Sequence, residues 1–366
     1  MLRTGFVGAG LIAWAHAISL QAMIETGTID AAIAAVYDVD ASRASALAGA
    51  CGARVVAGID QLLEQCEAVW VCTPTALHRE AVETAISRGR AIFCEKPLAP
   101  DLAGAQALAE AVEASGVPGQ VGLVLRYAPV FRRLAELVAS GELGQPMAVV
   151  FRDDQYFPDQ GLYGSTWRGR AELTGGGCLI EHSIHDLDIL RFCLGEVTQV
   201  SARTARLSGH GDVEDVAAAT LAFASGASAQ LTSVWHDVLS RESSRQLELF
   251  FQHGYVRLQD DFSGPLLVQT SDGQRSLECP APGWFDDLSI APGSEGLAIG
   301  RYLEENRAFV EAVVEGKEPS PGFHEAVTAH RLVDAVYRSA AACGAPVRLD
   351  GGEPEPPQEA PANPVD

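Results

Sequence analysis

Short apolar runs alternate with longer helical patterns throughout residues 1–123, and this alternation constrains the fold more than any other feature. Strands of a parallel sheet are covered by helices on both faces, so they appear as nearly continuous apolar runs. The pattern therefore predicts an N-terminal α/β unit built on a parallel sheet with helices on both faces. The expected strands are 4–10, 31–40, 54–58, 68–75, 91–97 and 119–125.

The pattern changes after Tyr127. Residues 129–144 form one amphipathic helical pattern, with Gly144 as its expected end. Longer strand-like segments follow and meet at glycine-containing turns, which is typical of antiparallel meanders. Helical patterns at 301–316 and 324–344 close this part of the chain. The strand-like segments are 146–156, 197–208, 215–237, 245–259 and 264–278.

These patterns predict two domains and a tail. A chain of 366 residues is too long for one ordinary hydrophobic core. We assign residues 1–123 to a cofactor-binding domain and 124–350 to an α/β domain that carries the substrate site. Residues 351–366 are rich in Pro and Glu without periodicity, so we expect a disordered tail.

The net charge of −22 excludes two classes of partner. Such a surface repels nucleic acid and anionic lipid. No apolar stretch approaches the roughly 20 residues of a membrane helix, and the start lacks the basic region of a signal peptide. The eight cysteines form no C-x-x-C pair, which favours buried thiols in a reducing compartment. We expect a soluble, cytoplasmic protein.

A glycine pattern follows the first expected strand. Gly8 and Gly10 occupy the first two positions of a G-x-G-x-x-G/A pattern, and Ala13 occupies the third. The glycines allow a tight turn and close approach of a pyrophosphate, while Leu11 and Ile12 open a helix whose free N–H groups favour negative charge. Glycine turns between strand and helix are common, so the pattern alone is weak evidence for a dinucleotide.

Asp38, at the end of the second expected strand, strengthens this interpretation. Its carboxylate is placed to accept hydrogen bonds from an adenosine ribose, although it follows Gly10 at a longer spacing than the usual ~20 residues. An acidic side chain favours NAD over NADP, whose 2′-phosphate it would repel. Arg43 lies nearby and could accommodate NADP. The alternative for Asp38 is a carboxylate in a surface turn.

Polar residues also follow the fourth and fifth expected strands, at the edge where ligands bind in open α/β sheets. Thr73 and Pro74 end the fourth strand, and His78 lies in the first turn of the next helix, where a surface residue is the alternative. Glu95 and Lys96 end the fifth strand and should project into the crevice that holds a nicotinamide. Desolvation and the positive ring would lower the pKa of this lysine.

A second informative segment lies near the middle of the chain. Glycines 175–177 lead into a helical pattern that places Glu181, His185 and Asp188 on one face. A carboxylate four residues before a histidine can share a substrate hydroxyl with it or fix its tautomer. We therefore predict acid–base chemistry here.

Two alternatives remain for this segment. One is a metal site built from His182 with His185, or from Cys178 with His182, but no complete ligand set occurs at a recognisable spacing. The other is a solvated polar helix face. We predict no metal.

Several motifs together resemble one family, the glucose–fructose oxidoreductase / inositol dehydrogenase / rhizopine-catabolism (Gfo/Idh/MocA) oxidoreductases. The resemblance extends over residues 3–345. It implies an N-terminal Rossmann domain, a C-terminal α/β domain with a large open, mainly antiparallel sheet that often forms an oligomer interface, and NAD(P)-dependent oxidation or reduction of sugars and polyols. The segments that carry it are 6–13, 69–78, 94–99, 125–146 and 175–195.

The resemblance also suggests roles for particular residues. The family lysine falls on Lys96 and the family histidine on His185, while Glu181 stands where many members have Asp. Trp167 and Arg168 match a pair that lines the nicotinamide side in some relatives. In the expected mechanism, His185 removes a hydroxyl proton, Lys96 hydrogen-bonds the same oxygen, and NAD⁺ takes the hydride.

Further residues are candidates for lining the substrate. They are Arg126, Tyr127, Tyr156, Trp235 and His236, although Trp235 could be core and Arg126 could be paired with an acid. The expected partners are a small neutral sugar or polyol and further copies of the chain, as a homodimer or homotetramer. Two other functions stay open: an enzyme that recycles its NAD, glycosidase-like, and a cofactor-binding regulator without catalysis.

Overall fold

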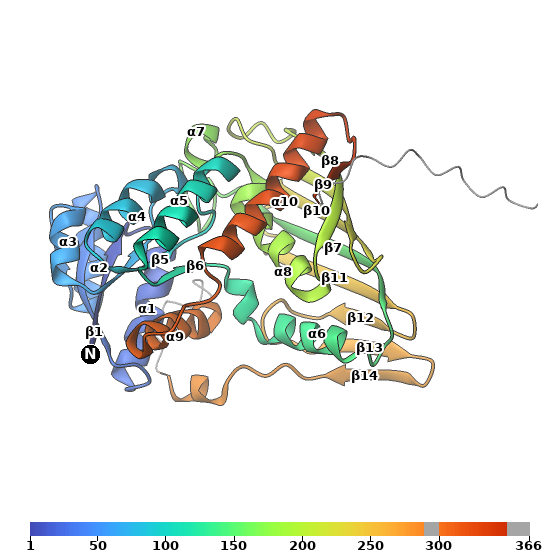
Figure 1. Cartoon of the computed structure of the whole chain (residues 1–366), viewed down its shortest axis with the longest axis horizontal. Coiled ribbons are helices and arrows are strands. Elements are labelled where there is room, and N and C mark those ends of the chain that lie inside the picture. Colours follow the sequence, from blue (N-terminus) through green and yellow to red (C-terminus); the bar gives the residue numbers. More distant parts are fainter. Residues whose placement is uncertain (289–299, 350–366) are drawn as a thin grey trace, which may run out of the picture.

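The computed structural model describes residues 1–288 and 300–349, and contains two sheets (Figure 1). The first has six strands in the order β3-β2-β1-β4-β5-β6, all parallel, which confirms the doubly wound sheet. Its strands are β1 Leu2–Val7, β2 Ala31–Tyr37, β3 Arg54–Val55, β4 Ala68–Val71, β5 Ala91–Cys94 and β6 Gly119–Val121. Its helices are α1 Leu11–Glu25, α2 Ala41–Cys51, α3 Ile59–Gln65, α4 His78–Ser87 and α5 Leu102–Ser115.

The second sheet has nine strands in the order β14-β13-β12-β11-β7-β10-β9-β8-β15. Strands β7 and β10 run parallel, and the other described neighbours pair antiparallel, so the predicted mainly antiparallel sheet is confirmed. Inward residues alternate with outward ones along β9 and β10, because one face alone is buried. The strands are β7 Pro146–Tyr156, β8 Val197–Ala205, β9 Val216–Phe223, β10 Ser228–His236, β11 Ser244–Phe251, β12 Tyr255–Leu258, β13 Leu266–Thr270, β14 Gly273–Leu277 and β15 Val347–Arg348.

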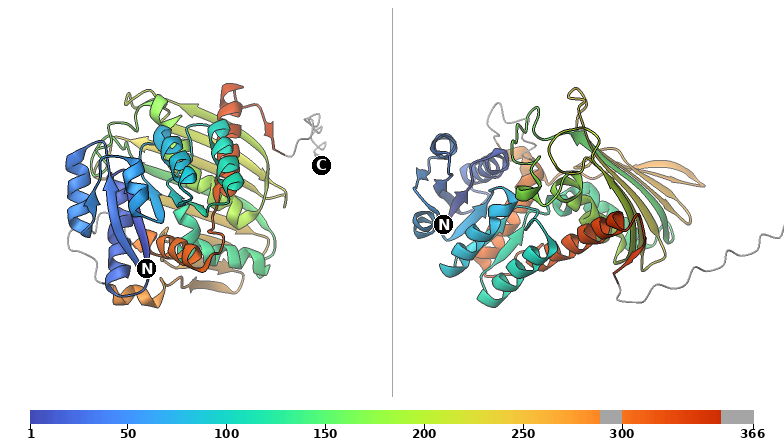
Figure 2. Two further views of the ribbon diagram at one scale, coloured as in Figure 1. Left: turned by 60° about the vertical axis from the view of Figure 1, so that its left-hand side comes forward. Right: turned by 90° about the horizontal axis from the view of Figure 1, so that it is seen from above.

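Helices α6 (Pro129–Ser140), α8 (Ile184–Leu194) and α10 (Phe323–Ala341) pack on the inner face of this sheet, the side on which the N-terminal domain also lies (Figure 2). Proline at the first position of α6 suits a helix start, since its missing N–H would have no partner there. The helix ends at Gly141, which adopts a left-handed conformation with φ of 66°. The expected end at Gly144 is therefore wrong, because Gly141 is the first glycine to offer this conformation.

Helix α9 (Gly300–Glu315) returns to the N-terminal domain and packs against α1. Its Leu303, Phe309 and Val310 join the core that contains Trp70. The sequence placed this helix within the domain 124–350, whereas its apolar face completes the core of the first sheet. The predicted tail, 351–366, lies outside the described residues. Among the described helices, none combines the length and apolar character required to cross a bilayer.

The glycines at 175–177 form a tight junction between distant segments. Gly175 has φ of +81°, and a Cβ there would lie 1.8 Å from the carbonyl oxygen of Pro100 in the N-terminal domain. A Cβ on Gly177 would lie 1.9 Å from the carbonyl oxygen of Glu214. Side chains are excluded here because three backbones meet, and this contact fixes where the following segment begins.

Substitution of Gly175 by alanine should therefore unfold the protein at markedly lower denaturant concentration. We expect a loss of roughly 3 kcal/mol or more, because left-handed strain adds to the overlap with Pro100. Gly226→Ala is the matched control, since Gly226 also has positive φ (+88°) but has nothing within 4 Å of the added carbon. That control should lose only about 1–2 kcal/mol. Equal losses in urea unfolding would contradict the close-approach explanation.

Candidate active site

The glycine turn after β1 has room for a phosphate. Gly8 has φ of +96°, and a Cβ there would lie 2.6 Å from the carbonyl oxygen of Cys72, so only glycine fits. A Cβ on Gly10 would meet nothing within 4 Å, which leaves open space at the start of α1. No side chain caps this helix, so its first N–H groups are free for an anion. The half-buried Leu11 and Ile12 form its first turn.

Asp38 holds this turn in place. Its Oδ2 accepts a hydrogen bond from Ala9 N–H at 2.7 Å, and its Oδ1 accepts one from Asp40 N–H at 2.8 Å. Each oxygen keeps a second acceptor position, so a ribose hydroxyl can be bound without breaking either contact. The residues present thus fit a dinucleotide, with Asp38 next to the glycine turn. Arg43 contacts Asp40 at 3.5 Å and is largely exposed.

The loop after β4 is held in place by a buried histidine. Pro74 precedes a short turn of 3₁₀-helix, Thr75–Leu77, and the hydroxyl of Thr73 is buried without a partner in the described part of the chain. His78 is 1% exposed, and its Nε2 donates to the carbonyl oxygen of Thr73 at 3.0 Å. Burial lowers the pKa of His78. It therefore positions the loop from inside, and neither the predicted cofactor contact nor a surface location fits its burial.

Lys96, after β5, joins the two domains. Its Nζ donates to the carbonyl oxygen of Glu181 at 2.7 Å. Burial and then the charge of Arg168 lower the pKa of Lys96, against opposing effects of Glu95 and Glu181. The predicted direction of the shift agrees with the structure, where desolvation is the largest cause.

The side chain of Glu95 points away from that of Lys96. The sequence suggested that both Glu95 and Lys96 enter the crevice, but the carboxylate of Glu95 is 7% exposed and contacts His16 Nε2 on α1 at 2.8 Å. Neighbouring residues at the end of a strand point to opposite sides of the sheet. Glu95 therefore faces the interior of the N-terminal domain, behind Lys96.

The predicted helix after the glycines begins as a π-helix, Cys178–Ser183, and continues as α8. Glu181 lies in the π-helical turn, where its Oε1 accepts a hydrogen bond from the hydroxyl of Thr75 at 2.7 Å. Arg168 Nε lies 3.5 Å from its Oε2. The carboxylate of Glu181 therefore reaches the N-terminal domain through Thr75.

Asp188 does not share this location, although the spacing predicted one face for the three residues. Its carboxylate accepts two hydrogen bonds from Arg126, at 2.8 and 2.6 Å. Arg126 is thus paired with an acid, the alternative that the sequence left open. The π-helical turn changes the spacing between Glu181 and the residues of α8, so a straight α-helix was the wrong template.

His185 lies in the first turn of α8 and is 7% exposed. Burial lowers the pKa of its imidazole well below the usual value, and the charges of Lys96 and Arg245 lower it further. Its Nδ1 has no hydrogen-bond partner among the described residues. A neutral imidazole with a free ring nitrogen can accept a proton. Because Lys96 is bound to Glu181, one turn earlier, and its charge acts on the imidazole of His185, an ammonium and an imidazole lie close together.

Other predicted site residues of the second domain lie around Arg168 and Tyr163. The guanidinium of Arg168 lies over the rings of Trp167 and Tyr163, at 5.2 and 5.7 Å from their centroids. The hydroxyl of Tyr156 accepts a hydrogen bond from Leu162 N–H at 3.2 Å and so supports the loop that carries Tyr163.

Three further candidates have partners of their own. Trp235 is 2% exposed and packs against Phe157, so its core alternative is correct. The hydroxyl of Tyr127 donates to the carbonyl oxygen of Ser320. His236 accepts a hydrogen bond from Val238 N–H at 3.1 Å, and its Nε2 lies 3.5 Å from Asp154.

Comparison with known proteins identifies the chain. Residues 2–123 match the family model of the oxidoreductase family with an NAD-binding Rossmann fold, and residues 131–257 match the GFO/IDH/MocA C-terminal domain. The D-apiose dehydrogenase of Paraburkholderia graminis is 30% identical over 335 residues, 89% of this chain and 85% of that protein. The chain belongs to the GFO/IDH/MocA family. It is therefore an NAD-binding oxidoreductase, as its motifs predicted.

Two further relatives agree with this assignment to the GFO/IDH/MocA family. The inositol 2-dehydrogenase of Rhizobium meliloti is 28% identical over 350 residues, 93% of this chain and 97% of that protein. Among solved structures, GenD2 from gentamicin A biosynthesis in complex with NAD is 29% identical, with a TM-score of 0.77 over 95% of this chain and 96% of that chain. The likeness thus covers both domains.

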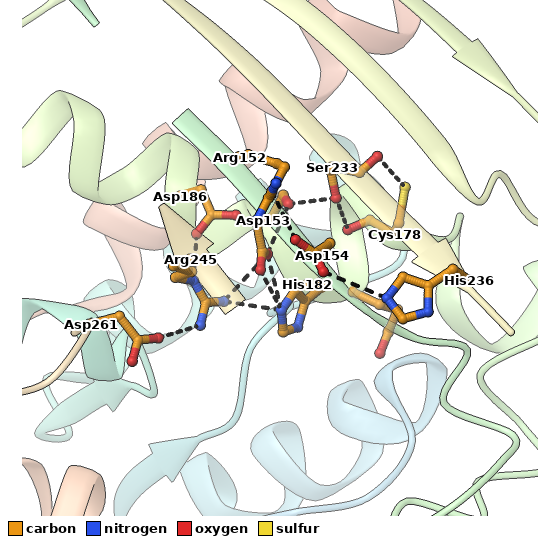
Figure 3. Close-up of polar contacts among 12 residues, drawn as sticks. Arg152, Asp153, Asp154, Cys178, His182, Asp186, Ser233, His236, Arg245 and Asp261 are labelled. Atoms are coloured by element: carbon orange, nitrogen blue, oxygen red, sulfur yellow. Dashed lines mark hydrogen bonds and ion pairs between the residues drawn. The ribbon is translucent and has the colours of Figure 1, made fainter. Parts of the chain in front are cut away.

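Sequence reasoning missed one charged cluster of this family member (Figure 3). Arg245 on β11 is buried and contacts Asp186 at 2.8 Å, Asp261 at 3.2 Å and Asp153 at 3.4 Å. Burial and the nearby Asp153 raise the pKa of Asp186 to about 7. The charged pair Asp153 and Asp154, which follows the apolar first half of β7, was the signal that could have revealed the cluster.

The same cluster bears on the metal alternative. His182 Nε2 lies 2.9 Å from Asp153 and 3.1 Å from Arg245, and Cys178 donates to the carbonyl oxygen of Ser233. His182 and Cys178 therefore have protein partners of their own. No group of three or more potential ligands is arranged for a metal ion within residues 1–288 and 300–349.

Replacing Thr75 by valine should weaken the contact between the domains. The change leaves the buried Oε1 of Glu181 without a donor, which should lower the free energy of unfolding by about 1–3 kcal/mol. Thr75→Ser keeps the hydroxyl and should stay close to wild type. Chemical denaturation of the two variants is the measurement, and equal stability would show that the hydroxyl contributes nothing.

Proposed function

We propose that this chain interconverts a hydroxyl-bearing carbon and a carbonyl in a neutral sugar, inositol or related polyol. The contact from Lys96 Nζ to the carbonyl of Glu181 carries the proposal, because it holds an ammonium beside the imidazole of His185. When bound along the glycine turn, NAD⁺ supplies the hydride acceptor. The D-apiose and inositol dehydrogenases among the relatives support this class of substrate.

His185 acts as the base for oxidation. Its buried ring is neutral over the working pH range, so a ring nitrogen can take the hydroxyl proton of the substrate. The positive charges of Lys96 and Arg245 make its protonated form unfavourable, so the proton is passed on rather than kept. In the reverse direction the protonated ring returns the proton to the same oxygen.

Lys96 stabilises the negative charge that develops on that oxygen. An ammonium has three donors, of which the carbonyl of Glu181 takes one. The remaining donors are free to bind the substrate oxygen, and burial strengthens their effect. Glu181 itself holds Thr75 and Arg168, so in this chain it positions the crevice instead of contacting the substrate.

Lys96→Met and His185→Ala should each lower kcat by roughly 10²–10⁴-fold, since each removes a group that acts in the transition state. The surface variants Lys317→Met and His324→Ala are matched controls, because both side chains are largely exposed. NADH formation is followed by absorbance across inositols, aldoses and deoxy-sugars. Turnover that survives both active-site substitutions would refute the roles. NAD binding without NADH formation from any of these compounds would favour a recycling enzyme or a regulator.

The pH dependence provides a separate test of His185. Its folded pKa is lowered, so the neutral base persists to lower pH than a free histidine would. In the oxidation direction, kcat/KM should stay level through the usual histidine range near ~6.5 and fall only at lower pH. An acid limb centred at the ordinary histidine pKa would contradict the buried location of the base.

We also propose that the chain assembles as a homo-oligomer through the outer face of the nine-stranded sheet. Apolar side chains that are at least 40% exposed lie on its strands β7 and β11, namely Met147, Val150 and Phe250. A dimer or tetramer in light scattering supports this.

All eight cysteines are free thiols, which supports a reducing, cytoplasmic location.

A further inference from the structure

A chain of buried polar side chains lies directly behind Lys96. His16 on α1, Trp70 on β4 and Asn306 on α9 are each 0% exposed, and Glu95 after β5 is 7% exposed. His16 Nε2 lies 2.8 Å from Glu95 Oε1, and His16 Nδ1 lies 2.8 Å from Asn306 Oδ1. The oxidoreductase mechanism described above does not use His16.

Two contacts determine which way the amide of Asn306 points. The indole of Trp70 can only donate, and its Nε1 lies 2.9 Å from Asn306 Oδ1, so that atom must be the oxygen. The hydroxyl of Ser19 donates to the carbonyl of His16 at 2.8 Å, so its oxygen is left to accept from Asn306 Nδ2. Both contacts assign the same orientation, although an amide alone would leave it ambiguous.

This orientation places a hydrogen on Nδ1 of His16. Because Asn306 Oδ1 is an acceptor, Nδ1 of His16 must carry a hydrogen and donate to it. The other ring nitrogen faces Glu95 Oε1, and Glu95 Oε2 accepts a hydrogen bond from Lys96 N–H at 3.2 Å. An imidazolium that donates from Nδ1 to Asn306 and from Nε2 to an ionised Glu95 satisfies all of these contacts.

Glu95 behaves as expected for an ionised group. Burial raises the pKa of its carboxyl, but the hydrogen bond and charge of His16, together with the charges of Lys96 and His78, bring the pKa below the usual value. The charge of Lys96 acts in the same direction. Buried opposite charges with several hydrogen bonds form strong, well-ordered pairs.

We infer that His16 is a positioning residue: it donates from one ring nitrogen to Asn306 and from the other to the carboxylate of Glu95, and Glu95 keeps the Lys96 ammonium charged and in place for the reaction. The inference rests on the proposed role of Lys96. The geometry gives Lys96 two anchors, a carbonyl from the second domain at its Nζ and a carboxylate at its backbone N–H.

Other charged groups face this pair from several elements. Those that act on Lys96 are Arg168, Glu181 and Arg245 besides Glu95, and those that act on Glu95 are His16, Lys96 and His78. Cys72, Cys94, Tyr302 and Glu305 face Glu95 as well, and its charge raises the pKa of each.

Glu305 on α9 offers a matched comparison with Glu95. It is 0% exposed, and neither carboxyl oxygen has a partner among the described residues. Burial and the charge of Glu95 raise its pKa well above the usual value, so it is neutral. Two buried glutamates thus lie near Lys96, and only Glu95 supplies a negative charge.

The test compares Glu95→Gln with Glu305→Gln in the full-length protein. Loss of the Glu95 charge lowers the pKa of Lys96, so the alkaline limb of kcat/KM should move to lower pH by about one unit. Glu305→Gln replaces one neutral group by another and should leave the limb unmoved. His16→Gln should shift the alkaline limb in the same direction as Glu95→Gln. The variant that carries both substitutions should show no larger shift than Glu95→Gln alone. Equal limbs in the Glu95 and Glu305 variants would overturn the inference.

A second measurement is independent of turnover. In ¹⁵N-histidine NMR of the wild type at pH 8, a buried ring with hydrogens on both nitrogens should be present, and this signal should vanish in His16→Gln. A single tautomer for His16 would overturn the inference even if Lys96→Met abolishes turnover. Conversely, a doubly protonated ring without NADH formation from any polyol would leave the charged His16–Glu95 pair established and refute the proposed function.

Discussion

The hydrogen bond from Lys96 Nζ to the carbonyl of Glu181 is the contact on which the rest of this structure depends. It joins the loop after β5 to a π-helical turn of the second domain, and so places a cation from one half beside His185 from the other. The glycines at 175–177 make the approach possible because no side chain separates their backbone from Pro100 and Glu214. The Thr75–Glu181 contact then closes the same junction from β4.

The buried charges follow from this geometry. A lysine that is desolvated beside Arg168 would lose its proton readily, and the carboxylate of Glu95 opposes that tendency from behind. His16 in turn compensates the charge of Glu95, and the amide of Asn306 satisfies His16. Each of these polar groups thus has a hydrogen-bond or charge partner in its neighbour, which is expected in an interior where an unpaired charge is costly. His185 has no such compensation, and its neutral state is the property that a base requires.

Much of this arrangement could be predicted from the sequence, because it depends on local patterns. Strand–helix alternation gave the parallel sheet, and the glycine turn with Asp38 gave the cofactor edge. The sequence could not show the direction of Glu95, since two adjacent charges at the end of a strand do not indicate which of them points to which side of the sheet. It could not show the π-helical turn that separates Asp188 from Glu181, because an α-helical period was assumed. The roles of Arg245 and His16 could not be predicted because their partners lie 59 and 79 residues away in the sequence, on other elements.

The return of α9 to the N-terminal domain affects how the protein is made. Synthesis proceeds from the N-terminus, and early domains commonly fold before later ones emerge. Here Asn306, the acceptor for both Trp70 and His16, is among the later residues to be translated. A nascent chain that ends before α9 has buried donors without an acceptor and an apolar face without its cover. Completion of the first domain must therefore wait until almost the entire polypeptide has left the ribosome.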